Sequence, residues 1–197
     1  MHKQVLVIYY SDSGSTREAA EILAGRFNTR PINVIDITKD YELKGDFIIF
    51  CTPNKYGKPA KPMLDFITNR RKQLKEFQIS VCFTCMDCYD FPADEQRYTC
   101  SVFKDSYFKE QTKSAQQMNS WEKSHSVHSY LEVLKNYLPE PIHSIAFFKG
   151  KLSFKELTFF DAFIMRFISM IRSNIRQGYY LRKEDLAAWG NELTEKL

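Results

Sequence analysis

Apolar residues along the chain alternate between two patterns. Short, continuous apolar runs predict strands buried on both faces, as in a parallel sheet covered by helices. Between these runs, apolar residues recur every three or four positions, which predicts amphipathic helices. The expected strands are 4–10, 32–37, 46–51, 79–85 and 142–148, and the expected helices are 15–27, 62–77 and 130–138. Strands that alternate with helices predict right-handed crossovers and an α/β sheet with helices on both faces.

One long segment does not fit this alternation. Residues 89–125 follow the fourth expected strand and are polar and aromatic. A long insertion in a compact domain is typically a lid, a binding loop or an interface, and the alternative is a solvated, partly disordered loop. The total of 197 residues fits a single domain, residues 1–197, that carries this insertion.

A second segment, residues 152–176, has an unusually wide apolar face. Arginines border that face, which broadens beyond a single stripe. The apolar positions are Leu157, Phe159, Phe160, Phe163, Ile164, Met165, Phe167, Ile168, Met170, Ile171 and Ile175, and the arginines are Arg166, Arg172 and Arg176. We favour a crossover helix packed on the sheet, because amphipathic core helices are common. The alternative is that residues 156–176 rest on an anionic membrane, as a peripheral contact.

Composition narrows the class of protein. The formal charge of +4 is far from that of a protein that coats nucleic acid, so no nucleic-acid partner is expected. Basic residues nevertheless concentrate in 55–75, with seven bases and one acid, and in 151–183, with seven bases and two acids. Aromatic residues make up 15% of the chain, which exceeds the needs of a core of this size. We therefore expect some of them to face a ligand or a membrane.

The amino-terminal pattern and the cysteine count bear on the compartment. The first apolar run is too short for a signal peptide, and no segment approaches the ~20 apolar residues that span a bilayer. Five cysteines, an odd number, favour free thiols in a reducing cytosol. We expect a cytoplasmic protein, with the inner face of the membrane as the place of any peripheral contact.

A hydroxyl-rich loop joins the first strand to its helix. Its backbone N–H groups, its hydroxyls and the helix N-terminus converge on one point, which predicts a site for a phosphate monoester. The loop consists of Ser11, Asp12, Ser13, Gly14, Ser15 and Thr16. It lacks the Gly-Lys-Ser/Thr of a Walker loop and the glycine spacing of a dinucleotide fingerprint, which disfavours a nucleoside triphosphate or NAD. A plain capped turn is the alternative.

Two further loops leave the same edge of the predicted sheet. The carboxyl ends of parallel strands meet at one edge, so all three loops should border one crevice. The loop after the third strand is Thr52, Pro53, Asn54, Lys55, Tyr56 and Gly57, and the loop after the fourth begins with Thr84, Cys85 and Met86. The alternative for Tyr56 is a surface tyrosine in an ordinary turn.

These motifs resemble those of a known family. Residues 11–16 resemble the flavodoxin phosphate loop Ser/Thr-x-Ser/Thr-Gly-x-Thr, and Thr52-Pro-x-x-Tyr56-Gly57 is similar to the second flavin loop of flavodoxin-like quinone reductases. Phe148-Lys-Gly150-Lys-Leu152, with the aromatic and basic segment after it, is similar to flavodoxin-type, menaquinone-dependent protoporphyrinogen dehydrogenases. The likeness covers roughly residues 4–88 and 126–195, without the insertion.

The resemblance implies a flavodoxin-like three-layer sandwich, with a five-stranded parallel sheet of order 2-1-3-4-5. It also implies FMN, with the phosphate on residues 11–16, the isoalloxazine beside residues 52–57, and Thr84, Cys85 and Met86 on the other side of the ring. The flavin itself carries the electron chemistry, so no catalytic side chain is expected.

Three functions follow from this picture. The first is an oxidoreductase that transfers electrons to or from an organic substrate such as a quinone or protoporphyrinogen. The second is a flavodoxin-type electron carrier between protein partners, although carriers of that type are usually acidic. The third is an interaction domain that has lost the flavin, which the intact phosphate loop disfavours. Any of these could form an oligomer.

Metal sites are the remaining alternative. Cys82-x-x-Cys85-x-x-Cys88 could ligate an iron–sulfur cluster, but Cys82 lies inside a predicted strand and Cys100 is too distant. Buried thiols are the favoured interpretation. His125 and His128 could share a metal if they are helical, but no third ligand is at hand, so a helix start at the surface is favoured.

Overall fold

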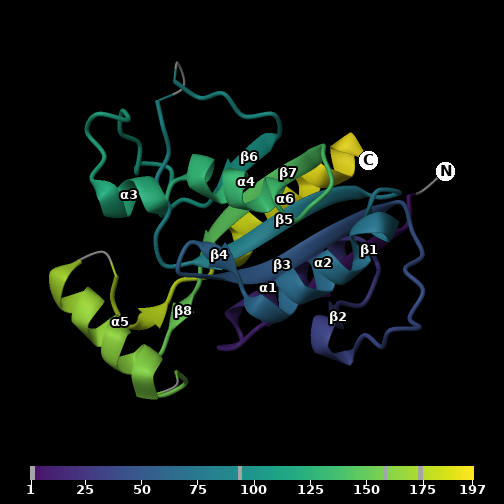
Figure 1. The fold of residues 1–197 in the computed structure, drawn as a ribbon, viewed down its shortest axis with the longest axis horizontal. Coiled ribbons are helices and arrows are strands. Elements are labelled where there is room, and N and C mark those ends of the chain that lie inside the picture. The colour runs from purple at the N-terminus through teal and green to yellow at the C-terminus, as the bar shows by residue number, and fades with distance from the viewer. Residues whose placement is uncertain (1–2, 93–94, 158, 173–174) are drawn as a thin grey trace.

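A parallel sheet runs through the middle of the molecule (Figure 1). The computed structural model describes residues 3–92, 95–157, 159–172 and 175–197. The sheet has the strand order β2-β1-β3-β5-β7-β6, and every neighbouring pair in this order is parallel. Its strands are β1 (Val5–Tyr9), β2 (Ile32–Asn33), β3 (Phe47–Lys55), β5 (Gln78–Cys85), β6 (Ser101–Lys104) and β7 (Ile142–Lys149). A short strand, β4 (Lys58–Pro59), pairs antiparallel with the end of β3.

Helices cover both faces of this sheet. Alternate residues of each buried strand point to opposite faces, and each face has its own apolar cluster. One cluster contains α1 (Ser15–Arg26) and α6 (Lys183–Lys196), and the other contains α2 (Lys61–Leu74) and α4 (Val127–Lys135). The predicted three-layer α/β architecture is confirmed. The five predicted strands, which are β1, β2, β3, β5 and β7, lie in the predicted order 2-1-3-4-5.

The sheet has more strands than the five that were predicted, and the second strand is shorter. Strand β2 ends at Asn33, and a 3-10 turn, η1 (Val34–Asp36), takes up the rest of the predicted strand 32–37. The side chain of Asn33 caps this turn by accepting a hydrogen bond of 3.3 Å from the N–H of Ile35. The additional strand β6 comes from the insertion and extends the sheet beyond β7.

The insertion is therefore built into the fold, and a solvated loop is the wrong description of its middle part. Asp105 and Phe108 are fully buried just after β6. The Asp105 carboxylate accepts hydrogen bonds from the backbone N–H groups of Lys149, at 2.5 Å, and Phe108, at 3.1 Å. One carboxylate thus fastens the insertion to the end of β7.

This carboxylate should leave a signature in the pH dependence of stability. Burial raises the pKa of Asp105 to about 6, so between about pH 4 and pH 6 the folded state binds more protons than the unfolded state. The contribution of Asp105 to stability is therefore largest at low pH and falls as the pH rises to 6. We expect Asp105→Ala to cost about 1 kcal/mol more at pH 5 than at pH 7.5 in urea unfolding. Asp36→Ala, at an exposed position, is the control, and an equal cost of Asp105→Ala at the two pH values would contradict the assignment.

The predicted helix in 152–176 does not pack on the sheet. Helix α5 (Phe159–Ile171) has no buried residue and projects from the body of the molecule, on a two-stranded antiparallel ladder of β8 (Lys151–Leu152) and β9 (Gly178–Tyr179) (Figure 1). The place on the sheet is taken by α6, whose Trp189 is fully buried. Within the described ranges, no helix is long and apolar enough to cross a bilayer. The remaining helix is the short α3 (Ser120–Ser124) of the insertion.

Candidate functional site

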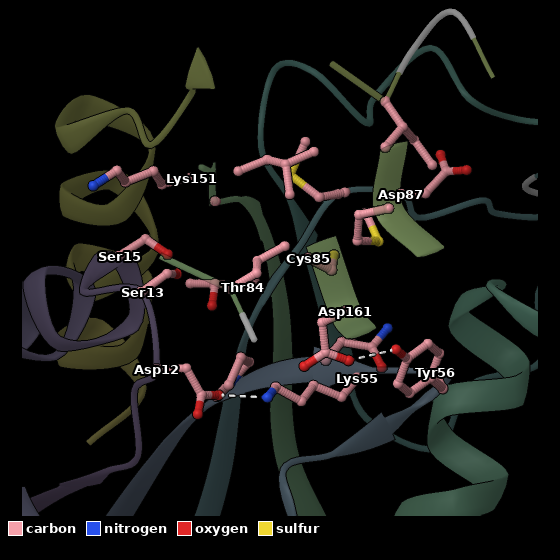
Figure 2. A pocket seen from close by; sticks show the side chains of 18 of the residues that line it. Asp12, Ser13, Ser15, Lys55, Tyr56, Thr84, Cys85, Asp87, Lys151 and Asp161 are labelled. Carbon is pink, nitrogen blue, oxygen red and sulfur yellow. Dashed lines mark hydrogen bonds and ion pairs between the residues drawn. The ribbon is translucent and has the colours of Figure 1, made fainter. Parts of the chain in front are cut away.

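A pocket lies at the carboxyl ends of β1, β3 and β5, where the three predicted loops meet (Figure 2). Its empty space, which includes the open mouth, is about 990 Å³. Among the predicted site residues, those that line it are Asp12, Ser13, Ser15, Pro53, Asn54, Lys55, Tyr56, Thr84, Cys85 and Met86.

The first loop presents the start of α1 to the pocket. Gly14 occupies the N-cap position in a left-handed conformation (φ +88°), and it has no side chain with which to cap the helix. The N–H groups of the first turn of a helix have no partner within the helix, so they are free to bind an anion at this end. The hydroxyls of Ser13 and Ser15 face the same pocket (Figure 2). This arrangement can hold a phosphate.

An ion pair links the first loop to the second. Lys55 Nζ lies 3.0 Å from Asp12 Oδ2 (Figure 2). The hydroxyl of Tyr10 donates a hydrogen bond of 2.9 Å to Asp12 Oδ1. The carboxylate of Asp12 would otherwise repel an anion at the start of α1. Its pairing with Lys55 offsets that charge and holds the two loops together.

The second loop is a tight hairpin that presents Tyr56. Lys55 pairs with Lys58 across a two-residue turn, and both turn residues, Tyr56 (φ +53°) and Gly57 (φ +80°), are left-handed, as such hairpins require. Tyr56 is 64% exposed. Its hydroxyl donates a hydrogen bond of 2.8 Å to Asp161 Oδ1 of α5. Partial burial, and then this carboxylate, raise the pKa of Tyr56.

Asn54 places an unsatisfied acceptor in the pocket wall. Its Oδ1 is buried and has no hydrogen-bond partner within the described structure. A buried carbonyl oxygen without a partner is costly, at about 1–3 kcal/mol, so it indicates a donor that is supplied by a ligand.

The third loop joins the first at the floor of the pocket. Thr84 Oγ1 and Thr16 Oγ1 share a buried hydrogen bond of 2.6 Å. A Cβ added at Gly150 would lie 3.1 Å from Ser15 Oγ and 3.4 Å from Thr84 Cβ. Glycine at position 150 is therefore what lets β7 approach both loops this closely.

The other predicted site residues lie behind the lining. Ser11 Oγ accepts a hydrogen bond of 3.0 Å from the N–H of Gly14, which shapes the first loop. Thr52 Oγ1 accepts one of 3.1 Å from the N–H of Ala60, which supports the hairpin. Thr16 and Gly57 likewise serve the shape of the loops, in contacts given above, and Gly57 lies against the insertion, since its Cβ would be 3.5 Å from the carbonyl oxygen of Ser124.

One wall of the pocket was not predicted from the sequence. Trp121 Nε1 of α3 donates to Asp87 Oδ2 at 3.0 Å, and the His125 ring stacks on Trp121 at 4.1 Å between ring centroids. Burial raises the pKa of Asp87, an effect that the Trp121 hydrogen bond opposes, and burial lowers the pKa of His125. The aromatic richness of the insertion was the one signal for this wall. The missed lining residues are Asp87, Trp121, His125, Gly150, Lys151, Leu152, Leu157, Asp161, Met165, Ile168 and Ile175.

The cysteines beside the pocket are buried thiols. Burial raises the pKa values of Cys82, Cys85 and Cys88 well above the ordinary value, which keeps these thiols protonated. Among the described residues, no group of three histidine, cysteine or acidic side chains is arranged to hold a metal ion.

Comparison with known proteins identifies the family to which these loops belong. A family model described as a flavodoxin domain matches residues 6–176. No curated protein matches the chain. Among solved structures, an archaeal flavodoxin is similar at 12% identity and a TM-score of 0.43, covering 98% of this chain and 96% of its own. A WrbA-like flavodoxin from Agrobacterium tumefaciens is similar at 13% identity and a TM-score of 0.45, with the same coverage. A flavodoxin from Fusobacterium nucleatum, bound to flavin mononucleotide, is similar at 9% identity and a TM-score of 0.42, covering 99% of each chain.

Proposed function

We propose, from the premise that this chain belongs to the flavodoxin domain family, that it is an FMN-dependent oxidoreductase that exchanges electrons with an organic substrate. The observation that carries the proposal is the pocket at the sheet edge, which combines a bare helix N-terminus at one end with the unpartnered Asn54 Oδ1 in its wall. The proposed place of action is the cytoplasm, with a peripheral contact at the membrane through residues 156–176.

The residues of the pocket fit FMN. The first turn of α1, with the hydroxyls of Ser13 and Ser15, would hold the phosphate. Asn54 Oδ1 can accept a hydrogen bond from a ring N–H, which would relieve its buried, unpartnered state. Tyr56 on one side, with Cys85 and Met86 on the other, would flank the ring. The remaining predicted residues, Ser11, Asp12, Gly14, Thr16, Thr52, Pro53, Lys55, Gly57 and Thr84, shape or line these loops.

FMN, when bound, supplies the electron chemistry, and the side chains supply orientation and exclusion of water. Tyr56 and Asp161 close one side of the pocket through their hydrogen bond. Met165 and Ile168 of α5, together with Leu157 ahead of the helix, add an apolar wall. A dry pocket strengthens the electrostatic interactions that Lys55 and the helix N-terminus make inside it.

An organic substrate is favoured over a protein partner by the walls beyond the three loops. The stacked Trp121 and His125, with Met165 and Ile168 of α5, extend the pocket with aromatic and aliphatic surface. Such surface suits a flat, apolar molecule such as a quinone or a porphyrinogen. This is also the substrate class implied by the resemblance to protoporphyrinogen dehydrogenases. The alternative is a flavodoxin-type carrier, which the basic segments 55–75 and 151–183 disfavour.

The visible absorption spectrum of the purified protein tests the proposal, followed by mass identification of the released ligand. We expect flavin bands, FMN in the extract, and turnover of a soluble quinone by the reduced protein without a protein partner. Reduction by a flavodoxin reductase with no turnover of quinone or porphyrinogen would establish the carrier instead. A colourless protein that does not bind added FMN would refute both functions.

A further inference from the structure

Helix α5 exposes a continuous apolar face to solvent. Its large apolar side chains are between 61% and 92% exposed: Phe159, Phe160, Phe163, Phe167, Met170 and Ile171. Soluble monomers rarely expose contiguous apolar patches beyond a few hundred Å² unless the patch binds something. We call these six residues the outer face of α5. The helix stands away from the sheet (Figure 1), so the outer face is not an uncovered part of the core.

The two sides of α5 have different surroundings. Phe159, Phe163, Phe167 and Met170 follow one another at spacings of four, four and three, so they form one stripe along the helix. Asp161, Met165 and Ile168 lie on the other side and line the pocket. One side of α5 therefore faces the pocket, and the apolar stripe on the other side is exposed and suits an apolar partner.

Charge indicates what this partner is. Residues 151–176 contain five basic and two acidic side chains. The two acids are already engaged, since Glu156 pairs with Lys151, and Asp161 accepts the hydrogen bond from Tyr56. Lys155, Arg166 and Arg176 are exposed. A helix with phenylalanines on one face and arginine or lysine at its borders has the composition of a helix that lies in the interface of an anionic bilayer.

We propose that the outer face of α5 docks this protein on an anionic membrane surface, with the phenylalanines in the acyl boundary and the exposed Lys155 and Arg166 among the lipid phosphates. The inner side of the same helix lines the pocket, so docking would place the pocket at the lipid boundary, where a lipid-soluble redox substrate is found. The docking itself stands independently of the proposed FMN-dependent activity, and only this route for the substrate rests on that activity.

Flotation of the full chain with vesicles tests the docking surface. The vesicles contain equal parts of phosphatidylcholine and phosphatidylglycerol, or phosphatidylcholine alone. We expect co-flotation with the anionic vesicles, and a loss of binding as salt is raised. The double variant Phe163→Ser/Phe167→Ser should lower the partition coefficient by at least about tenfold, because two exposed rings lose their apolar contact with lipid. Arg166→Glu should weaken binding to the anionic vesicles.

The matched control is Ile35→Ser, which removes a side chain that is 65% exposed in η1, outside α5. It should float as the unaltered chain does. Because the substituted phenylalanines are exposed, the thermal midpoint of the double variant should equal that of the unaltered chain, which excludes misfolding. Flotation of the double variant at the unaltered level would overturn the proposal.

A second copy of the chain is the competing occupant of the outer face. A dimer in sedimentation that becomes monomeric in the double variant, together with no flotation, would assign the face to self-association and overturn the membrane proposal. None of these measurements depends on bound FMN. A protein that floats but does not bind FMN would refute the proposed function and leave the docking surface intact.

Discussion

Replacing Ser13 with aspartate is expected to weaken FMN binding roughly 100- to 1,000-fold. Ser13 lines the pocket beside the bare N-terminus of α1, where the phosphate would lie. A carboxylate there would stand within a few ångströms of the phosphate, and two like charges at about 4 Å in a partly dry site repel by a few kcal/mol. Titration of the FMN-free protein, followed by the quenching of flavin fluorescence, gives the dissociation constant.

Two controls separate this effect from damage to the fold. Ser13→Ala removes the hydroxyl without adding a charge, and should weaken binding only about five- to tenfold, the value of one hydrogen bond. A carboxylate near a helix N-terminus also stabilises the helix, so FMN-free Ser13→Asp should unfold at or slightly above the temperature of the unaltered chain. Equal affinities for the alanine and aspartate variants would place the phosphate elsewhere.

Trp189→Ala is expected to have the largest effect on stability, a loss of about 3–5 kcal/mol in the free energy of unfolding. Trp189 is fully buried between α6 and the sheet, and its ring lies 6.0 Å from that of Phe148. Truncation leaves a cavity of nearly the volume of the indole ring, which the surrounding strands cannot fill. Urea unfolding of the FMN-free protein is the measurement, because bound ligand would add its own stabilisation.

Trp189→Phe is the matched control. It keeps most of the apolar volume but loses the hydrogen bond of 3.1 Å that Trp189 Nε1 donates to Ser144 Oγ. Ser144 is buried on β7, so its hydroxyl would lose that partner, and we expect a cost of about 1–3 kcal/mol. A cost for Trp189→Ala no greater than that for Trp189→Phe would show that α6 contributes little to the core.

The central strands could be predicted from the sequence because a strand covered on both faces must be apolar at nearly every position. β1 satisfies this condition, β3 does so over its first five residues, and β5 and β7 do so over the shorter runs 81–83 and 145–148. β6 does not, since its four residues begin with serine and end with lysine, and it pairs on one side only. A short edge strand inside a polar segment has no periodicity that separates it from a loop.

Helix α5 shows a second limit of prediction from the sequence. Its apolar spacing equals that of a core helix, and the pattern indicates that a face is apolar without indicating what covers it. The opposite case is α6, whose buried Leu186, Trp189 and Leu193 are spaced by three and four among charged residues, and were missed. Of the two helices, the more polar α6 packs on the sheet, and the more apolar α5 does not.

The candidate site also has a part that the sequence predicts and a part that it does not. Three loops could be assigned to one crevice because parallel topology brings the carboxyl ends of β1, β3 and β5 to one edge. The other walls depend on contacts between segments far apart in the chain. Trp121 meets Asp87 across 34 positions, and Asp161 meets Tyr56 across 105. No local pattern encodes such pairs, so the wall of the proposed substrate pocket became visible only in the structure.

The two strands at the edges of the sheet are too short to pair extensively with a strand of another chain. The edge strands β2 and β6 have two and four residues, whereas the inner strands β3, β5 and β7 each have eight or nine. A long, apolar strand with unpaired N–H and C=O groups is a template for intermolecular pairing and fibril growth. Without β6, the strand Ile142–Lys149 would present one such row of groups to solvent. By covering this edge, the insertion should protect the protein from aggregation, and a variant that lacks the insertion should be less soluble.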